Sequence, residues 1–211
     1  MGHDFSAKRI NYGKHRPLNE QTAPTNPYTL FSTWFDDALN EKGIEEAYIM
    51  FLATATLSGI PSVRTVLLRE YGKEGLVFYT NYNSRKGQEI DENPNVSLLF
   101  FWDVLERQVR IEGSIEKIEA PKSDAYFNSR PEESQYAAMV SPQSEAIESR
   151  TWLIKKMDEA KQHEAKRPAH WGGYVVKPVY FEFWQGGANR LHDRLSYTQQ
   201  NDSWLLKRLA P

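Results

Sequence analysis

The chain of 211 residues contains no cysteine. A protein without thiols forms no disulfide, Cys-ligated zinc site or iron–sulfur cluster, and it offers neither a thiol nucleophile nor a cysteinyl link to a cofactor. The sequence also lacks the run of about 20 apolar residues that crosses a membrane and the apolar N-terminal segment of a secretory signal. We therefore expect a cytoplasmic protein with no membrane partner.

A surplus of charge of one sign is missing as well. The 26 Lys and Arg residues are balanced by 28 Asp and Glu residues, so the formal net charge is -2. This balance gives no support for nucleic acid or an anionic membrane as a partner. A hydrophobic content of 40% and a charged content of 26% are typical of a soluble globular protein. The length fits one domain with a well-filled core.

The short motifs of several enzyme classes are absent. The sequence contains no GxGxxG segment and no P-loop, and without GxSxG a serine-hydrolase triad has no starting point. No HExxH or HxxxH pair occurs, so we expect no metal site from the five histidines, which are His3, His15, His163, His170 and His192.

The N-terminal part of the chain divides into an arm and a helix. Residues 1–25 are polar and lack periodicity, which indicates a mobile arm or a segment that becomes ordered over a site. Asn26 and Pro27 predict a helix start, and Gly43 predicts a stop. We expect a single domain over residues 26–211.

Strand-like runs dominate the rest of the sequence. Short turns that contain glycine separate several of them, which indicates antiparallel neighbours rather than βαβ units. We predict strands over 47–57, 62–71, 76–81, 95–103, 107–118, 174–185, 191–199 and 203–210, and helices over 84–94 and within 121–164. The expected fold class is mainly β with helices (α+β), an antiparallel β-barrel decorated with helices.

Two strand arginines differ in their surroundings. Arg64 interrupts an apolar run, and a partly buried arginine needs an anionic partner, either a carboxylate or a phosphate. Arg110 shares one strand face with Gln108 and Glu112, opposite Val109 and Ile111. We therefore interpret Arg110 as solvent-facing.

The segment from Tyr79 to Gly87 joins a predicted strand to a helix. It places Ser84, Arg85 and Lys86 at the helix N-terminus, where free N–H groups and the helix dipole favour an anion. A phosphate site and a capped surface helix with two solvated cations are equally compatible with this pattern.

A second anion site is conceivable around Arg130. Tyr126 and Arg130 are spaced i, i+4, so they share a helix face. Pro131 ends that helix and Ser134 lies near the start of the next. Tyrosine, arginine and serine together can bind a phosphate, but without further support an ordinary helix junction is favoured.

The segment WQGGANRLHDR (184–194) is the least surface-like part of the sequence. Its two glycines allow a close approach of the backbone. We predict that Arg190, His192 and Arg194 alternate along a strand and point to one face, which requires a compensating anion or carboxylate. Asp193 points the other way in this prediction and is not the obvious compensating group.

Several of these segments, in this order, resemble the pyridoxine/pyridoxamine 5′-phosphate oxidase family. The resemblance extends from about residue 9 to Pro211, and it rests on RTVLLR (64–69), FYTN (78–81), SRKG (84–87), ERQVRIEG (106–113), YFNSRPEESQ (126–135), SPQS (141–144), EFWQGGANRLHDR (182–194) and the terminal WLLKRLAP. It implies an antiparallel FMN-binding split barrel that forms a homodimer, with non-covalent FMN in a cleft between the subunits.

The resemblance also implies roles for individual residues. The FMN site would comprise Arg64, Arg69, Tyr79, Thr80, Arg85, Lys86, Gln108, Gln143, Ser144, Trp184 and Arg194, with Arg64, Arg85 and Lys86 on the phosphate side. The substrate would be bound by Arg9, Tyr12, Arg69, Tyr126, Arg130, Ser134, Arg190 and His192, with Arg190 and His192 as the catalytic pair. Arg69 stands where many members carry lysine, which keeps the charge but changes its shape.

The implied reaction oxidises pyridoxamine or pyridoxine 5′-phosphate to pyridoxal 5′-phosphate. In this scheme a hydride leaves C4′ of the substrate for N5 of FMN, and O2 reoxidises the flavin and yields H2O2. Arg190 and His192 would position the substrate and steer its protons. Two alternatives stay open: another split-barrel flavoprotein such as a flavin reductase or a haem-degrading relative, and a non-catalytic protein that binds flavin or pyridoxal phosphate.

Overall fold

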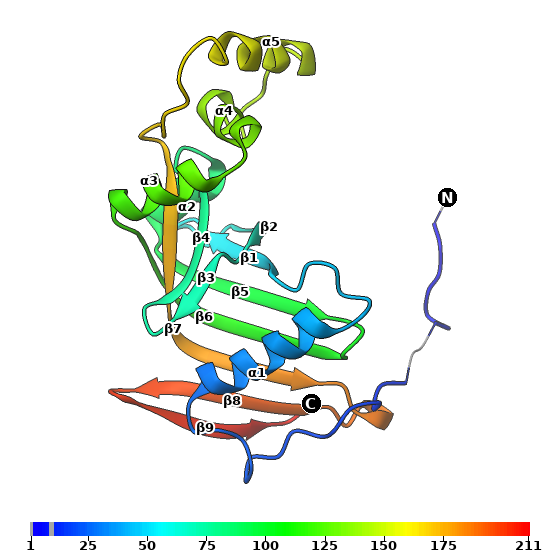
Figure 1. Ribbon diagram of the computed structural model, residues 1–211. Helices are drawn as coiled ribbons and strands as arrows, with labels where there is room; N and C mark the ends of the chain where they lie inside the picture. Colours follow the sequence, from blue (N-terminus) through cyan, green and yellow to red (C-terminus); the bar gives the residue numbers. More distant parts are fainter. Residues whose placement is uncertain (1, 9–10) are drawn as a thin grey trace. The chain divides into compact units, whose positions relative to one another are not determined.

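The computed structural model describes residues 2–8 and 11–211 (Figure 1). Its contacts divide the chain into two compact units. Unit 1 comprises Met1–Ile49, Leu98–Glu112 and Val179–Pro211, and unit 2 comprises Met50–Ser97 and Gly113–Pro178. Three strands contribute residues to both units: β5 (Asn95–Trp102), β6 (Arg107–Lys117) and β7 (Trp171–Gln185).

The other elements each lie in one unit, apart from the first residue of β1. Unit 1 contains α1 (Pro27–Asn40), a short 3-10 helix η1 (Ala188–Arg190), β8 (Asp193–Gln200) and β9 (Ser203–Leu209). Unit 2 contains β1 (Ile49–Ala55), β2 (Pro61–Leu67), β3 (Glu70–Gly72), β4 (Gly75–Asn81), α2 (Arg85–Glu92), α3 (Ala120–Ser129), α4 (Glu132–Val140) and α5 (Arg150–Ala160).

The strands are paired in the order β2-β1-β5-β6-β7-β4-β3, and β8 lies between β7 and β9. The registers of β3 with β4, β4 with β7, β7 with β8, and β8 with β9 are all antiparallel. The predicted α+β class with an antiparallel sheet is therefore confirmed. Among the described residues, no helix is both long and apolar enough to cross a membrane.

The first helix forms as its sequence predicts. The Asn26 side chain caps α1 by accepting a hydrogen bond from the Tyr28 N–H at 2.9 Å. Apolar side chains at helical spacing, including Phe31 and Trp34, are buried along one face. The Trp34 ring meets the Phe183 ring edge-on, with 5.3 Å between the ring centroids. This aromatic packing attaches the helix to the strands of unit 1.

Two predicted strands have different boundaries in the structure. The run 62–71 is not one strand, because β2 and β3 stand at opposite ends of the strand order and the chain must leave β2 after Leu67. The run 191–199 becomes a strand only at Asp193, because Asn189 and Arg190 adopt φ angles of 57° and 64°. These left-handed conformations end the extended backbone before residue 191.

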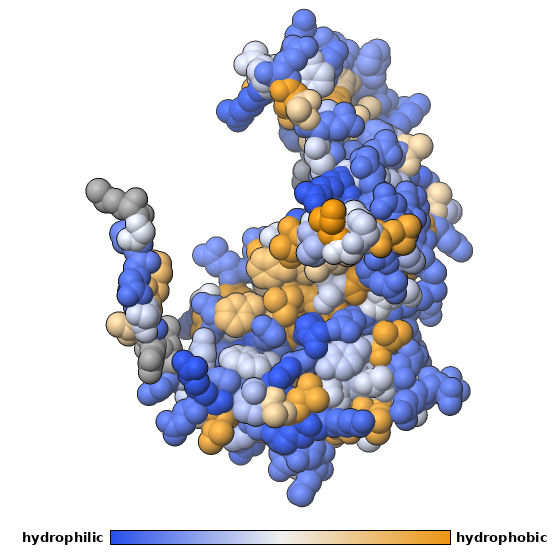
Figure 2. Space-filling model, turned by 180° about the vertical axis from the view of Figure 1, so that it is seen from behind, coloured by the Kyte–Doolittle hydropathy of each residue, from blue (hydrophilic) through white to orange (hydrophobic). Residues whose placement is uncertain are grey.

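The two helices after α3 have little buried apolar surface. Tyr136 is the buried residue of α4, and α5 has none. The surface over both helices, uppermost in Figures 1 and 2, is largely hydrophilic.

Candidate functional site

A cavity of about 290 Å³ lies within unit 2. It is lined by Thr65, Val66, Leu67, Arg69, Tyr79, Thr80, Asn81, Lys86, Tyr126, Arg130, Gln143 and Trp171. The end of β2, the end of β4, the start of α2 and the junction after α3 thus meet around one space. The cations at positions 69, 86 and 130 all line it, although they are far apart in the sequence.

Arg130 lies at the C-terminal cap of α3, where Pro131 prevents the helix from continuing. Its guanidinium lies over the Trp171 ring at 4.7 Å from the centroid. Its Nη1 atom is buried and has no hydrogen-bond partner among the described residues. Burial lowers the pKa of Arg130, and the nearby Arg69 charge lowers it further. A buried, unpaired cationic donor at this cavity is suited to an anion.

Aromatic rings form one wall of the same cavity. The Tyr79 and Tyr126 rings are stacked with centroids 3.8 Å apart, and the Tyr79 and Trp171 rings are stacked at 5.7 Å. Burial raises the pKa of Tyr79 to about 12, so its hydroxyl stays protonated at neutral pH. The wall therefore combines flat apolar surface with a hydroxyl group.

Lys86 is buried beside the N-terminus of α2, with 8% of its surface exposed. Its Nζ atom donates hydrogen bonds to Thr80 Oγ1 at 3.1 Å, Ser84 Oγ at 3.2 Å and Gln143 Oε1 at 2.7 Å. All three acceptors are neutral. Burial lowers the pKa of Lys86 to about 8, with a contribution from the Arg64 charge. Of the two alternatives left open by the sequence, the one with two solvated cations is therefore wrong for this residue.

The start of α2 is fixed by its cap and by close packing. Ser84 Oγ accepts a hydrogen bond from the Gly87 N–H and donates one to the Asn81 carbonyl at 2.6 Å. A Cβ atom at Gly87 would lie 1.9 Å from the Tyr82 carbonyl oxygen. Only glycine allows the first turn of α2 to lie so close to the turn that follows β4, where Lys86 lines the cavity.

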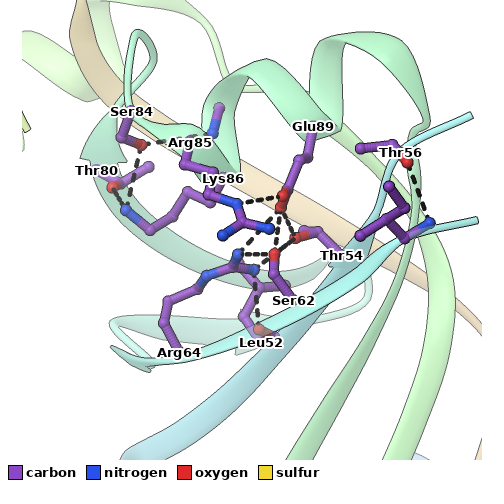
Figure 3. A network of polar contacts seen from close by, with 12 residues as sticks. Leu52, Thr54, Thr56, Ser62, Arg64, Thr80, Ser84, Arg85, Lys86 and Glu89 are labelled. Atoms are coloured by element: carbon purple, nitrogen blue, oxygen red, sulfur yellow. Dashed lines mark hydrogen bonds and ion pairs between the residues drawn. The ribbon is translucent and has the colours of Figure 1, made fainter. Parts of the chain in front are cut away.

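Glu89 joins the neighbouring cations into one network (Figure 3). Its Oε2 atom accepts hydrogen bonds from Thr54, Ser62 and Arg64, the last at 3.0 Å. Its Oε1 atom accepts one from Arg85 at 2.8 Å. Burial alone raises the pKa of Glu89, but these hydrogen bonds outweigh it and hold the pKa at about 2. Arg64 therefore pairs with a carboxylate, which is one of the two kinds of anionic partner, carboxylate or phosphate, that its place in the sequence predicts.

This network carries a surplus of positive charge. Arg64 and Arg85 share the one carboxylate of Glu89, and the nearby Lys86 bonds only to neutral acceptors, so the three cations exceed the carboxylate by two charges. The Arg85 side chain is 60% exposed, so it has room to turn toward a ligand. A phosphate monoester carries up to two negative charges at neutral pH.

Unit 1 contains a second cavity, of about 720 Å³. It is lined by Lys8, Asn11, Tyr12, Gly187, Asn189, Arg190 and His192. The Tyr12 ring meets the rings of Trp184 and His192 edge-on, with centroids 5.6 and 5.9 Å away. His192 Nδ1 accepts a hydrogen bond from the Gly187 N–H at 3.1 Å, so in the neutral ring Nε2 carries the proton.

The predicted common strand face of Arg190, His192 and Arg194 is wrong. Arg190 lies in η1 and is exposed, and His192 precedes β8, so only Arg194 lies on the strand. The chain turns here because Asn189 and Arg190 take left-handed conformations after Gly187. Arg190 and His192 nevertheless line the same cavity.

The carboxylate that balances Arg194 is Glu182. This buried residue accepts a hydrogen bond from Arg194 Nε at 2.9 Å and another from Arg110 Nη2 at 2.6 Å. Arg110 also lies over the Tyr180 ring at 5.1 Å. The interpretation of Arg110 as solvent-facing is therefore incomplete: its side chain is 36% exposed, but one of its hydrogen bonds reaches a buried carboxylate.

Several predicted site residues lie outside these two cavities. Gln108 is half-buried on β6, Ser134 is in the first turn of α4, and Ser144 is exposed with a φ of 78°. None of them lines either cavity. Arg9 lies outside the described residues. Sequence reasoning missed Glu89, Glu182 and the Trp171 wall, because charge and apolar pattern alone do not show which carboxylate faces which arginine.

Comparison with known proteins agrees with this arrangement. Residues 35–164 match the family model described as pyridoxamine 5′-phosphate oxidase. Residues 171–211 match the one described as the pyridoxine 5′-phosphate oxidase C-terminal dimerisation region. The chain is similar to the pyridoxine/pyridoxamine 5′-phosphate oxidase of Christiangramia forsetii, at 44% identity over 100% of both chains. It is 50% identical to that of Trichormus variabilis over 92% of both chains.

Solved structures confirm the split-barrel fold that the resemblance implied. PhzG from Burkholderia lata, in complex with tetrahydrophenazine-1-carboxylic acid, has a TM-score of 0.86 at 28% identity, covering 95% of this chain and all of that one. A pyridoxamine 5′-phosphate oxidase-related, FMN-binding protein from Nostoc punctiforme has a TM-score of 0.69 at 16% identity, covering 90% of this chain and 98% of that one. With two family models over most of its length and relatives of nearly half identical sequence, the chain belongs to the pyridoxamine 5′-phosphate oxidase family.

Proposed function

We propose that the protein is an FMN-dependent oxidase in vitamin B6 metabolism. It converts pyridoxamine or pyridoxine 5′-phosphate to pyridoxal 5′-phosphate, with O2 as electron acceptor and H2O2 as product. The names of its full-length relatives support this activity. The observation that carries the proposal is the buried, unpaired Nη1 of Arg130 at a cavity that also presents Arg69 and Tyr126. These donors together suit a phosphate, and the buried Nη1 atom of Arg130 has no hydrogen-bond partner within the described part of the chain.

The neighbouring cation network fits the phosphate of FMN. Lys86, Arg64 and Arg85 would hold it, because their charge exceeds that of Glu89 by two. Thr80 and Gln143, both bonded to Lys86, would border the same group. In unit 1, Trp184 and Arg194 are the residues proposed to face the cofactor, and Gln108 and Ser144 keep their proposed roles. When bound, FMN supplies the capacity to take two electrons from the substrate and pass them to O2.

The protein's own groups bind and orient the substrate. Arg69, Tyr126 and Arg130 hold its phosphate, with Ser134 at the start of α4 as a further donor. Arg190 and His192 border the second cavity, where the protonated Nε2 of a neutral His192 is a donor toward a pyridine substituent. The protein supplies no nucleophile in this scheme, which agrees with the absence of cysteine and of a hydrolase motif.

A homodimer completes the proposed site. The C-terminal residues match a dimerisation region, and the residues proposed to bind FMN and substrate are divided between the two units. We propose that unit 2 of one subunit supplies the phosphate-binding groups and unit 1 of its partner supplies Arg190, His192 and the arm.

The test is an aerobic assay of the purified protein loaded with FMN. Pyridoxamine 5′-phosphate should yield equal amounts of aldehyde and H2O2, and pyridoxamine without phosphate should react far more slowly. A flavin-loaded protein that forms neither product would instead be a non-catalytic binding protein. Failure to bind added FMN would contradict the cofactor assignment. A reduced phenazine carboxylate serves as a control substrate, because the relative PhzG was crystallised with such a compound.

A further inference from the structure

The segment of the arm from residue 11 to residue 20 is attached to unit 1 at several places, of which two are buried or half-buried carboxylates, Glu106 and Asp193. The nearer one to the second cavity is Glu106, which has 2% of its surface exposed. Its Oε2 atom accepts hydrogen bonds from the Gly13 N–H at 2.7 Å and the Lys14 N–H at 3.2 Å. Hydrogen bonds from backbone N–H groups to a buried carboxylate are stronger than those between neutral groups. This one side chain therefore fixes two consecutive peptide groups.

Glu106 is itself held in an unusual backbone conformation. It has a φ of 52°, which is uncommon for a residue with a side chain. Its carbonyl accepts hydrogen bonds from the Gly186 N–H at 2.8 Å and from Gln185 Nε2 at 3.1 Å. These hydrogen bonds to the end of β7 fix the Glu106 backbone, and with it the position of the carboxylate.

Gly186 leaves the space that the arm residue Tyr12 occupies. A Cβ atom there would lie 2.9 Å from Glu106 Cβ and 2.9 Å from Tyr12 Cβ. Because that atom is missing, Tyr12 packs directly over the end of β7, where its ring meets Trp184 and His192. Tyr12 and Asn11 form one wall of the second cavity, and Arg190 and His192 form another.

We propose that Glu106 is a positioning residue, which fixes the arm so that Tyr12 forms a wall of the substrate site. The effect of Glu106 on substrate binding rests on the proposed oxidase function. Its effect on the position of the arm does not. The second attachment acts separately: Asp193 accepts a hydrogen bond from the Leu18 N–H at 3.1 Å and pairs with Arg208 at 2.6 Å. Loss of Glu106 therefore removes the two hydrogen bonds that fix Gly13 and Lys14, while the attachment at Leu18 remains.

Limited trypsin digestion of the full-length, FMN-loaded protein tests the attachment directly. Trypsin cuts after Lys14, whose own N–H is one of the two donors, but not after Arg16, because Pro17 follows. Glu106→Ala should speed cleavage of the Lys14–His15 bond about tenfold, since it removes both hydrogen bonds. Glu106→Gln should recover most of the protection, because one amide oxygen can accept both N–H groups.

Gly186→Ala provides an independent variant that keeps the carboxylate. Its new methyl group displaces Tyr12, so it should also speed cleavage after Lys14, whether or not Glu106→Ala folds. Asp103→Ala, exposed on the same turn, and Gly72→Ala, where nothing lies within 4 Å of the added atom, are the matched controls. Unchanged cleavage in both test variants would overturn the proposal, and so would an equal rise at sites throughout the chain.

Enzyme kinetics test the consequence for the substrate. Glu106→Ala and Gly186→Ala should raise the KM for pyridoxine 5′-phosphate about tenfold with kcat within about threefold, because the wall contributes binding rather than chemistry. The affinity for FMN should stay unchanged. If the wild-type protein proved inactive, the proposed function would fail while the cleavage results still decided the role of Glu106. Faster cleavage with an unchanged KM would contradict the role of the arm in substrate binding.

Discussion

At the scale of single residues, Arg130 is the side chain on which the proposed substrate site depends most. Its position was visible in the sequence through the Tyr126 spacing and Pro131, but its burial was not. A residue at a helix end is usually solvated, and only the fold shows that Trp171 covers the guanidinium. The choice between a phosphate site and an ordinary helix junction could not be made without that contact.

Arg130→Ala should raise the KM for the phosphorylated substrate about 30-fold or more, which corresponds to loss of about 2 kcal/mol from a charge-assisted hydrogen bond. FMN should stay bound, and the free protein should not lose stability, because the variant removes a buried unpaired donor. Steady-state kinetics and flavin absorbance measure both effects. Arg150→Ala, exposed on α5, is the control. Loss of FMN instead of substrate affinity would mean that the two phosphate sites are interchanged.

The lowered pKa of Lys86 predicts that a rise in pH has opposite effects on FMN binding and on the stability of the fold. Its pKa of about 8 lies below the ordinary value of 10.5, so the folded protein loses this proton first as the pH rises. Between these two values the unfolded chain binds more protons at this site, and the contribution of Lys86 to stability therefore increases with pH. A phosphate prefers the charged form. The Kd for FMN should rise up to about tenfold per pH unit above pH 8.

Fluorescence titration of the apoprotein with FMN, repeated across this pH range, measures the effect. Riboflavin is the matched ligand, because it lacks the phosphate and its affinity should show no such fall. Lys86→Met keeps the length of the side chain and should remove the pH dependence. The same slope in this variant would show that another group titrates.

At the scale of elements, the regular patterns were predictable and the backbone reversals were not. The capped helix α1 and the buried alternation in β6 follow directly from periodicity. The break between β2 and β3 depends on which strands pair, and η1 depends on left-handed residues that are not glycine. For the same reason, the paired carboxylates Glu89 and Glu182 could not be found by residue spacing.

The start of α2 gives a prediction that separates helix propensity from packing. On propensity alone, Gly87→Ala should stabilise a helix by about 1 kcal/mol. The structure predicts the reverse, a loss of about 2 kcal/mol or more, because the new Cβ atom would lie 1.9 Å from a backbone oxygen that cannot rotate away. Denaturant unfolding of the apoprotein measures the change. Gly72→Ala is the control, and a stabilised Gly87→Ala would contradict the packing described for α2.

At the scale of the whole molecule, the charge balance of the sequence concealed the chemistry of the site. The 26 basic and 28 acidic residues nearly cancel, although unit 2 alone contains two groups of cations that we propose bind anions. The split-barrel fold could be predicted from the resemblance of several segments. The division of the proposed site residues between the two units could not be predicted, because it depends on which strands contribute residues to both units.

Mixed dimers test whether the working site is shared between subunits. Arg130→Ala removes a group of unit 2, and His192→Ala removes one of unit 1. If each site combines unit 2 of one subunit with unit 1 of its partner, a mixed dimer of the two variants contains one intact site. Such a dimer should recover up to about half of the wild-type activity. Activity of isolated mixed dimers no higher than that of either variant alone would show that each subunit builds its site from its own units.

The most direct test of the central claim is an anaerobic titration of the FMN-loaded protein with pyridoxine 5′-phosphate, followed by admission of air. The visible absorbance of the oxidised flavin should disappear as one equivalent of substrate is consumed, and it should return in air with formation of one equivalent of H2O2. An unchanged absorbance in a protein that still binds both FMN and the phosphorylated substrate would contradict the assignment as an oxidase.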